Sequence, residues 1–262
     1  MKLILAFVAI SLTGCSGMIR SLDNEDKQHI NNVGVISLLG DRFHGVSIGA
    51  TIFGNKGYSA DVPDWEIDKY IESSVADALA RSTSYNVSII DKAGTSANRF
   101  YTDQQGIMIN DDKLYSLPDV TKLDTIILID RTQYDNQPFL RSPYGFYQRT
   151  SSNVAYYQCI YSLFTISVLD TTLRQDTAIS WSFPLRGRGA CHEPEEGLPV
   201  AWKNQFEEYT DAEQELIKSE VLKSIDRSID HAIEYLGITT QFEPVVDDSA
   251  TEPKSGRSTR AY

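Results

Sequence analysis

The pattern of apolar and polar positions predicts four strands in the first half of the chain. Residues 33–39 form a short apolar run that stops at Gly40, as in a buried strand. Residues 45–53 alternate between apolar side chains and small or polar ones, which predicts a strand with one buried face. A third strand is expected at residues 87–90. Residues 123–130 are apolar on both faces and give the clearest signal of a central strand.

A helix is expected between the second and third strands. Asp61 or Asp64 is able to cap its start, and Pro63 suits its first turn. Apolar residues then recur at helical spacing, which predicts an amphipathic helix with one face towards the core. The expected inward residues are Ile67, Ile71, Val75, Ala78 and Leu79.

A second, longer helix is expected towards the C-terminus. Thr210 and Glu213 match a capping box, in which each side chain accepts a hydrogen bond from the other residue's backbone amide. Gly237 supplies the stop signal, because glycine readily adopts the left-handed conformation that ends many helices. The expected inward residues are Leu222, Ile225, Ile229, Ala232, Ile233 and Leu236.

Between the two helices the sequence predicts a long antiparallel hairpin. Residues 153–169 and 178–185 are its expected strands, and residues 170–176 form the polar turn between them. If this turn is centred near residue 172, Tyr157 pairs with a position near residue 187. Residues 92–122 are expected to be a loop with one or two helical turns.

Together these elements predict the fold class α/β (α+β): a single mixed β-sheet with a long antiparallel hairpin and packed helices. No internal repeat and no linker divides residues 33–240, so one domain is expected. Pro, Ser, Thr and charged residues dominate residues 241–262, and this tail is expected to be disordered.

Composition excludes several classes of protein. The chain of 262 residues has 36 acidic and 24 basic residues, a formal net charge of −12, and 41% hydrophobic residues. Such length and apolar content suffice for a folded core, which excludes a wholly disordered chain. The excess of acid argues against nucleic acid as a partner, since phosphate contacts need clusters of Lys and Arg.

The N-terminus has the features of a secretory signal. Lys2 precedes an apolar run at residues 3–12, which is about half the length needed to cross a bilayer. The run ends in Leu12-Thr13-Gly14-Cys15, which resembles the lipobox of bacterial lipoproteins. This resemblance implies cleavage after residue 14 and lipidation of Cys15. The alternatives are an ordinary signal peptide and a buried N-terminal strand.

The lipobox also implies a location. Several acyl chains anchor a protein stably, so membrane contact is expected through the lipid anchor, without a further membrane segment. In enteric lipoproteins an aspartate after the cysteine favours retention in the inner membrane, and this chain has Ser16 there. The resemblance therefore implies an outer-membrane lipoprotein that faces the periplasm. Residues 1–14 are the expected signal peptide, and residues 15–32, polar and aperiodic, the lipidated tether.

Two cysteines remain once the anchor is assigned. In an oxidising periplasm, Cys159 and Cys191 are a candidate disulfide. Two free structural thiols are the first alternative. The second is a metal site at Cys191-His192-Glu193 with the acids that follow, although no second histidine stands at ligand spacing. A metal is therefore not expected.

Motifs typical of catalysis are missing from the sequence. It contains no Gly-x-Ser-x-Gly, His-Glu-x-x-His or phosphate-loop pattern. His29 falls in the tether and His231 on the outer face of the last helix. His44 and His192 are left as loop histidines with no nucleophile evident beside them. No catalytic residue and no cofactor is expected.

Three acids bracket the predicted central strand. Asp124, Asp130 and Asp135 form a carboxylate cluster, or they are strand-end caps or exposed acids. Strand-end caps are the simpler interpretation, because Asp commonly accepts hydrogen bonds from nearby backbone amides.

The segment at residues 131–157 is the most informative about binding. It combines tyrosines and phenylalanines with prolines and arginines, and both Arg and aromatic residues are enriched at binding hot spots. The hairpin pairing above brings two further arginines to the same end. The candidate binding-surface residues are Arg141, Tyr144, Phe146, Tyr147, Arg149, Arg186 and Arg188. The alternative is that the tyrosines pack over a sheet edge and the arginines offset nearby acids.

The order of elements resembles a group of outer-membrane lipoproteins, including the curli-secretion lipoprotein and the lipoprotein activators of penicillin-binding proteins. Three runs carry the resemblance: Val33-Gly-Val-Ile-Ser, the strand that starts at Leu123, and Ser167-Val-Leu-Asp-Thr171. The proline-rich aromatic segment departs from that pattern. Those proteins act through protein–protein contact, so the resemblance implies a protein-interaction or envelope-assembly module with a protein partner in the cell envelope. It assigns no functional residue.

Two other functions are open at this point. One is an envelope hydrolase whose site is assembled from distant residues around His44 or His192. The other is a structural subunit of a secretion complex. The sequence leaves the oligomeric state and the identity of the partner open.

Overall fold

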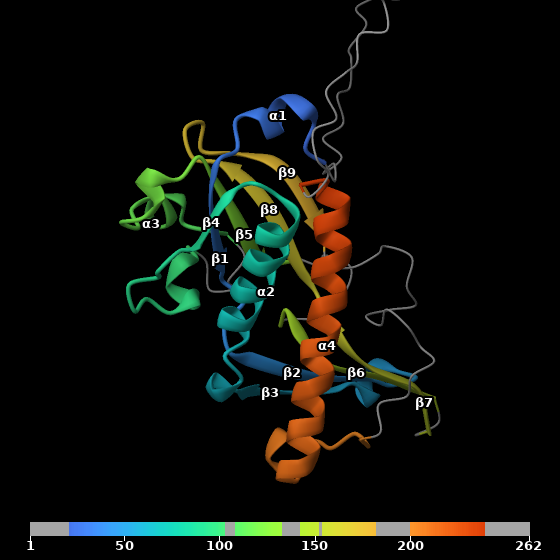
Figure 1. Ribbon diagram of the computed structural model, residues 1–262. Coiled ribbons are helices and arrows are strands. Elements are labelled where there is room, and N and C mark those ends of the chain that lie inside the picture. Colours follow the sequence, from blue (N-terminus) through green and yellow to red (C-terminus); the bar gives the residue numbers. More distant parts are fainter. Residues whose placement is uncertain (1–20, 103–107, 133–141, 152–153, 182–199, 239–262) are drawn as a thin grey trace, which may run out of the picture.

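The computed structural model describes residues 21–102, 108–132, 142–151, 154–181 and 200–238 (Figure 1). The expected signal peptide, the anchor at Cys15 and the tail at residues 241–262 lie outside the described residues. The fold class predicted from the sequence is confirmed, because strands and helices mix in one α/β arrangement. The strands, however, form two sheets where one was expected.

The five-stranded sheet has the order β4-β1-β5-β8-β9 and the four-stranded sheet the order β3-β2-β6-β7. The strands are β1 (Asn32–Ser37), β2 (Arg42–Ile48), β3 (Lys56–Asp61), β4 (Asn86–Ile89), β5 (Thr125–Arg131), β6 (Tyr144–Ser151), β7 (Val154–Ser162), β8 (Phe164–Asp170) and β9 (Gln175–Trp181). The helices are α1 (Asn24–Gln28), α2 (Ile67–Ser82), α3 (Asp111–Tyr115) and α4 (Asp211–Leu236).

Apolar character decides which strands are central. In the five-stranded sheet, β1 pairs in parallel with both β4 and β5, and β8 and β9 continue the sheet antiparallel. The predicted central strand is β5, whose first five residues are all buried. In the other sheet, β2 lies between β3, its antiparallel neighbour, and β6, its parallel neighbour.

The predicted hairpin is divided between the two sheets. Strand β7 ends at Ser162 and pairs with β6, while β8 begins at Phe164 and pairs with β5 and β9. Tyr157 therefore stands opposite Arg149, and the position near residue 187, its expected partner, lies outside the described residues. One apolar run fills two strands because Leu163, itself buried, joins them, and its amide donates to the carbonyl of Pro143 (2.6 Å).

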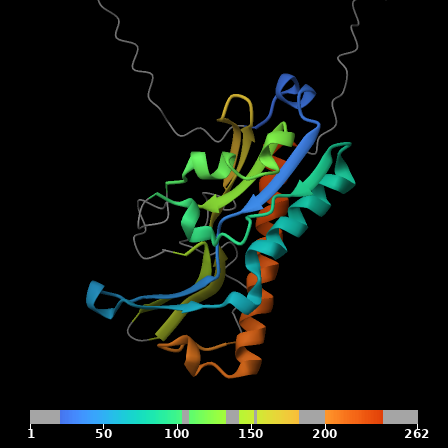
Figure 2. The ribbon, with the colours of Figure 1, turned by 90° about the vertical axis from the view of Figure 1, so that its left-hand side faces the viewer.

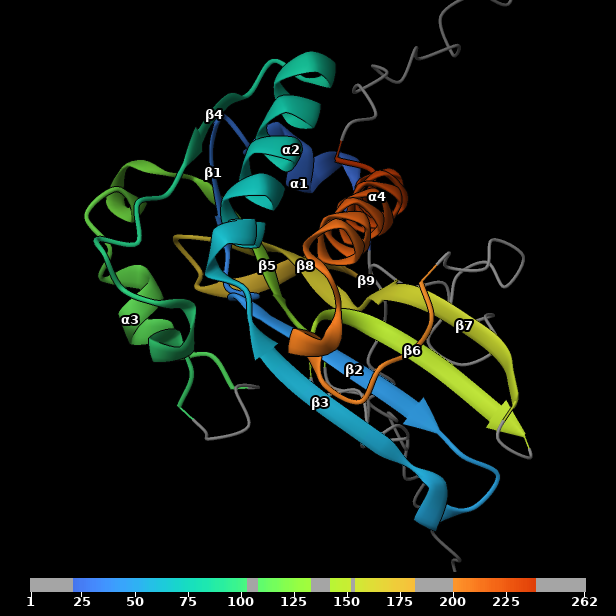
Figure 3. The same ribbon diagram turned by 90° about the horizontal axis from the view of Figure 1, so that it is seen from below.

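Both long helices cover one face of the five-stranded sheet (Figures 1 and 3). Helix α2 buries four of its five predicted inward residues, all except Ala78. Its N-cap residue is Glu66, which has a φ of 48° and makes no side-chain cap hydrogen bond, so the expected cap from Asp61 or Asp64 is wrong. The α2 face of β1 and the apolar face of α4 join in the main core.

Helix α4 runs along both sheets and ties them together. Both halves of the predicted capping box at Thr210 and Glu213 are present, and Gly237 ends the helix with a φ of 66°. The helix also approaches β7 closely, since the hydroxyls of Ser224 and Ser228 lie 3.0 and 2.6 Å from that of Ser162. These small side chains let a helix pack directly on a sheet.

A second core lies on the other face of the five-stranded sheet. Leu38 and Ile36 pack there with Ile126 and Leu128 under the segment at residues 97–123, whose described part holds α3 and two short 3₁₀ turns. The predicted loop with helical turns is therefore confirmed in its described part. It packs over this second core and covers it.

Part of the predicted tether belongs to the folded domain. Residues 24–28 form α1, capped at both ends of its first turn by Asp23 and Asp26. Leu22 and Ile30 are buried, and the Leu22 amide donates to the carbonyl of Leu236 (2.9 Å). The two apolar side chains give this otherwise polar segment enough buried surface to dock, so the domain begins about ten residues earlier than the pattern suggested.

Candidate functional site

The structure contradicts the central part of the predicted binding surface. Tyr144, Phe146 and Tyr147 are buried, because β6 is an inner strand of its sheet with both faces covered. Phe146 meets Trp202 edge to face, with 5.6 Å between ring centroids. Arg149 is exposed as predicted. Arg141, Arg186 and Arg188 lie outside the described residues.

Of the two cysteines of the predicted disulfide, the structure describes Cys159 only. Cys159 is buried in β7 beside Val46, Tyr147 and Tyr161, and its sulfur takes part in a disulfide. Cys191 lies outside the described residues, so its pairing with Cys159 stays a prediction.

The histidines and acids with possible catalytic roles are dispersed. His231 and His29 are exposed, His44 is half-buried in β2, and His192 lies outside the described residues. Within the described ranges, no three His, Cys, Asp or Glu side chains group as metal ligands would.

Two of the three acids beside the central strand cap backbone groups. The Oδ2 atom of Asp124 accepts hydrogen bonds from the amides of Asn31 (3.2 Å) and Asn32 (2.9 Å). The Oδ1 atom of Asp130 accepts from the Arg131 amide (2.6 Å). Asp135 lies outside the described residues. The strand-end caps favoured by the sequence are thus present at both described positions.

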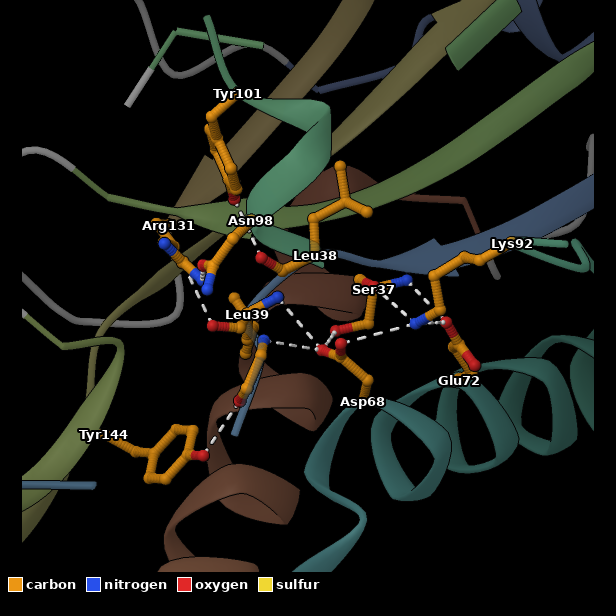
Figure 4. A network of polar contacts seen from close by, with 11 residues as sticks. Ser37, Leu38, Leu39, Asp68, Glu72, Lys92, Asn98, Tyr101, Arg131 and Tyr144 are labelled. Carbon is orange, nitrogen blue, oxygen red and sulfur yellow. Dashed lines mark hydrogen bonds and ion pairs between the residues drawn. The ribbon is translucent and has the colours of Figure 1, made fainter. Parts of the chain in front are cut away.

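A dense polar network surrounds the segment that leads from one sheet to the other. We call residues 37–40 the junction segment: they run from the last residue of β1 towards β2 (Figure 4). Leu38 and Leu39 are fully buried, so the backbone groups here need partners inside the protein. Each of the four amides and four carbonyls of residues 37–40 has a hydrogen-bond partner.

Acceptors from two elements, α2 and β5, hold the four amides of the junction segment. Two carboxylates on the first turns of α2 take three of them, and β5 takes the fourth. The pairs are Ser37 N–Glu72 Oε1 (2.9 Å), Leu38 N–Ile129 O (2.8 Å), Leu39 N–Asp68 Oδ1 (3.0 Å) and Gly40 N–Asp68 Oδ1 (3.1 Å).

Side chains from four different parts of the chain hold the four carbonyls. Each donates one hydrogen bond, and together they surround the segment (Figure 4). The pairs are Lys92 Nζ–Ser37 O (2.9 Å), Tyr101 Oη–Leu38 O (2.8 Å), Arg131 Nε–Leu39 O (3.0 Å) and Tyr144 Oη–Gly40 O (2.8 Å). The predicted surface residue Tyr144 is thus part of this framework.

Lys92 is the charge centre of the network. Its Nζ lies 2.9 Å from Glu72 Oε1 and 3.3 Å from Asp68 Oδ2, and the three side chains are 20%, 7% and 15% exposed. Burial alone would lower the pKa of Lys92, but the two carboxylates outweigh it and raise that pKa above its usual value. Burial raises the pKa of Glu72, against the opposing effect of Lys92.

Arg131 and Tyr101 form the other side of the network. The guanidinium lies 4.7 Å from the centre of the Tyr101 ring and donates to Asn98 Oδ1 (2.6 Å). Burial and the nearby Asp130 carboxylate raise the pKa of Tyr101. Gly40 has a φ of 75°, and a Cβ there would lie 2.9 Å from the guanidinium, so this position suits glycine alone.

The network fixes the backbone that connects the two sheets. It lies at the carboxyl ends of the parallel strands β4, β1 and β5, where open α/β sheets commonly bind ligands. Here the chain itself occupies that position, and the donors and acceptors described above hold its backbone. The arrangement fixes the direction in which β2 leaves the five-stranded sheet.

Strand β2 leads to the most exposed apolar residues in the described part of the chain. Ile52 is 76% and Phe53 94% exposed, and they are neighbours at the tip of the β2–β3 hairpin. We call residues 49–55 the hairpin tip. It extends sideways from the four-stranded sheet and away from the helices, in the half of the molecule opposite α1 (Figures 1 and 2).

The hairpin tip has a fixed backbone. Residues 52–54 form a 3₁₀ turn, in which the Gly54 amide donates to the carbonyl of Thr51 (2.9 Å). The side chain of Asn55 accepts from the Gly49 amide (3.0 Å). Gly49 and Gly54 touch so closely that a Cβ on Gly49 would lie 2.8 Å from Gly54. The structure therefore presents Ile52 and Phe53 on an ordered turn.

Sequence reasoning missed this site because the alternation at residues 45–53 was interpreted as strand throughout. The usable signal was the pair Gly49 and Gly54 around a bulky apolar pair, within a run without charge from residue 45 to residue 55. Such a run is unusual at an exposed turn.

None of the helices in the described ranges is long and apolar enough to cross a bilayer. Comparison of the chain with protein-family models, with curated proteins and with solved structures finds no match.

Proposed function

We propose that this protein is a membrane-anchored lipoprotein of the bacterial envelope that binds an envelope component through the hairpin tip. It acts as an interaction or assembly module and not as a catalyst. The observation that carries the proposal is the pair Ile52 and Phe53, 76% and 94% exposed on an ordered turn.

The energetics of the hairpin tip support binding. Covering an exposed Ile or Phe side chain contributes roughly 1.5–3 kcal/mol each. A turn that is already ordered loses little conformational entropy on binding, so more of that free energy is available for affinity. An aromatic residue beside an aliphatic one is also a common centre of a protein interface.

In this proposal the lipid on Cys15 attaches the protein next to α1. Cys15 stands six residues before Ser21, the first described residue, and α1 follows at once. The junction segment holds the hairpin apart from that end (Figures 1 and 4). An anchor at one end and a binding element at the other is the layout of a module that links two envelope components.

Co-purification from detergent-solubilised envelopes tests the proposal. The variant carrying both Ile52→Ser and Phe53→Ser is expected to lose the components that the unaltered protein retains. Leu173→Ser is the matched control, because Leu173 is 63% exposed on the β8–β9 turn and far from the hairpin tip. Equal retention by the double variant and the unaltered protein would remove the basis of the proposal.

The anchor is tested separately. Cys15→Ser is expected to move the protein from the membrane fraction to the soluble fraction of the envelope without changing its fold. A variant that stays in the membrane fraction would show that the lipobox resemblance is misleading.

A further inference from the structure

The orientation of the hairpin tip limits what it can meet. Cys15 and Ser21 are six positions apart, and even a fully extended chain of that length spans only about 20 Å. A lipid on Cys15 therefore keeps the α1 end near its bilayer. The hairpin tip projects sideways from the four-stranded sheet, in the half of the domain opposite α1 (Figures 1 and 2). It is therefore held apart from the α1 end that the lipid keeps near the bilayer.

The chemistry of the hairpin tip is apolar with basic residues at its base. No charged side chain occurs from residue 45 to residue 55. Lys56 stands opposite Ser47 in β3, and Arg149 opposite Ile48 in β6, so an exposed basic residue lies on each side of β2 where the tip begins.

In the described part of this end of the sheet, Lys56 is linked to an acid only through Asn204. Lys56 donates to Asn204 Oδ1 (3.2 Å), and the Asn204 amide donates to Glu208 Oε2 (3.2 Å). The neighbouring Glu207 acts on Tyr58, which is further from the tip than Lys56. In a protein of net charge −12, the tip is thus an uncharged end with basic side chains at its base.

We propose that the hairpin tip inserts into an apolar pocket of a protein partner, and that acidic side chains line the rim of this pocket. The inference rests on the proposed function and names the class of its target. Ile52 and Phe53 fill the pocket, and Lys56 and Arg149 face the acidic rim. The opposite charges speed association and select the partner, while the two apolar side chains supply the affinity.

A protein fits these observations better than the other envelope components. The anchoring bilayer is disfavoured because the lipid on Cys15 keeps the α1 end, and not the hairpin tip, near it. A glycan offers mainly hydroxyl groups, which give Phe53 little apolar surface to bury against. A pocket in a folded protein supplies a dry apolar floor and a charged rim together.

Photo-crosslinking in intact cells tests the inference. A benzophenone amino acid replaces Phe53 in the full chain, and in a control chain it replaces Leu173. Irradiation is expected to give an adduct only from position 53, and mass spectrometry of the digested adduct to find a partner peptide with Asp or Glu near the attachment point. Combining Lys56→Glu with Arg149→Glu is expected to lower the yield about fivefold. Lys122→Glu, a distant charge reversal, should leave it unchanged.

The possible outcomes separate the two proposals. An adduct to a lipid or a glycan would overturn the protein pocket and keep the hairpin tip as the binding element. A peptide adduct whose yield is the same with and without the charge reversals at positions 56 and 149 would contradict the acidic rim of the proposed pocket. No adduct above that of the Leu173 control would overturn both this inference and the proposed function.

Discussion

Two buried tyrosines in the four-stranded sheet differ in whether the side-chain hydroxyl has a hydrogen-bond partner. Tyr144 donates to the Gly40 carbonyl (2.8 Å), and Tyr161 has no hydrogen-bond partner in the described structure. Both side chains are fully buried. A buried hydroxyl without a hydrogen-bond partner lowers the free energy of unfolding, so removing it costs nothing. Removing a hydroxyl that has a partner leaves that partner buried and unsatisfied, which lowers the stability.

The Phe variants are therefore expected to have opposite effects. Tyr144→Phe should lower the free energy of unfolding by about 1–3 kcal/mol, because it leaves the Gly40 carbonyl unpaired. Tyr161→Phe should leave it unchanged or raise it by up to about 1 kcal/mol. Urea unfolding of the two variants measures both values. A loss of stability in Tyr161→Phe as large as in Tyr144→Phe would contradict the assignment of these hydroxyls.

Lys92 makes stability depend on pH at the alkaline end. The pKa of this side chain is raised in the folded state, so its contribution is complete below about pH 10.5, the usual value for Lys. It is lost as the pH rises through the folded-state pKa. Buried tyrosines act in the same direction above about pH 10, because burial raises their pKa values as well.

Lys92→Met separates these contributions. Leaving Asp68 and Glu72 buried without a cation should cost about 3–5 kcal/mol at pH 8. The difference from the unaltered protein should shrink above pH 10.5, while the tyrosine contribution stays common to both. Unfolding free energies measured between pH 8 and pH 11.5 give this difference. A difference that stays constant over the range would show that Lys92 is not the charge centre of the junction.

At the scale of elements, the hairpin tip depends on one side-chain hydrogen bond. Asn55→Ala removes the acceptor of the Gly49 amide (3.0 Å). We expect faster hydrogen exchange at Gly49 and Gly54, with the global free energy of unfolding changed by less than about 1 kcal/mol, since loops open independently of the core. Thr51→Ala is the control, because its side chain makes no cap hydrogen bond. Unchanged exchange in Asn55→Ala would mean that the turn is held otherwise.

The start of α4 gives a second element-scale prediction. Hydrogen bonds from Lys203 (2.5 Å) and from the Thr210 amide (2.7 Å) lower the pKa of Glu213 to about 2. A lowered pKa stabilises the fold above pH 4.5, the usual value for Glu, and this contribution is lost as the pH falls towards 2. Carboxyl NMR titration should show a midpoint near 2, and Lys203→Met should raise it. A midpoint of 4 or above in the unaltered protein would contradict this geometry.

Elements with a strong local period were predictable, and their assembly was not. The apolar run that became β5 and the capping box of α4 carry their signal within a few residues. The division of the strands into two sheets depends on Leu163, where a continuous apolar run changes sheets. Only long-range pairing decides that change.

The candidate site shows the same limit. Aromatic residues at positions 144–147 predicted a surface, but β6 has a sheet neighbour on each side, so these side chains fill the core. Composition alone cannot distinguish a buried aromatic strand from an exposed aromatic loop. The junction segment was equally hidden, since its partners come from residues between 68 and 144.

At the scale of the whole molecule, the two sheets have different tasks. The five-stranded sheet with α2 and α4 forms the stable body next to the expected anchor, and the four-stranded sheet carries the hairpin tip away from it (Figures 1 and 3). The junction segment joins them with no unpaired backbone group among residues 37–40. The central claim is that this arrangement holds Ile52 and Phe53 towards an envelope target.

Chemical crosslinking in intact cells, followed by electrophoresis and mass spectrometry, tests that claim most directly. The unaltered protein and Leu173→Ser are expected to give the same discrete adducts, and the Ile52→Ser, Phe53→Ser double variant, with unchanged abundance, to lose them. Adducts that persist in the double variant at the level of the unaltered protein would contradict the account.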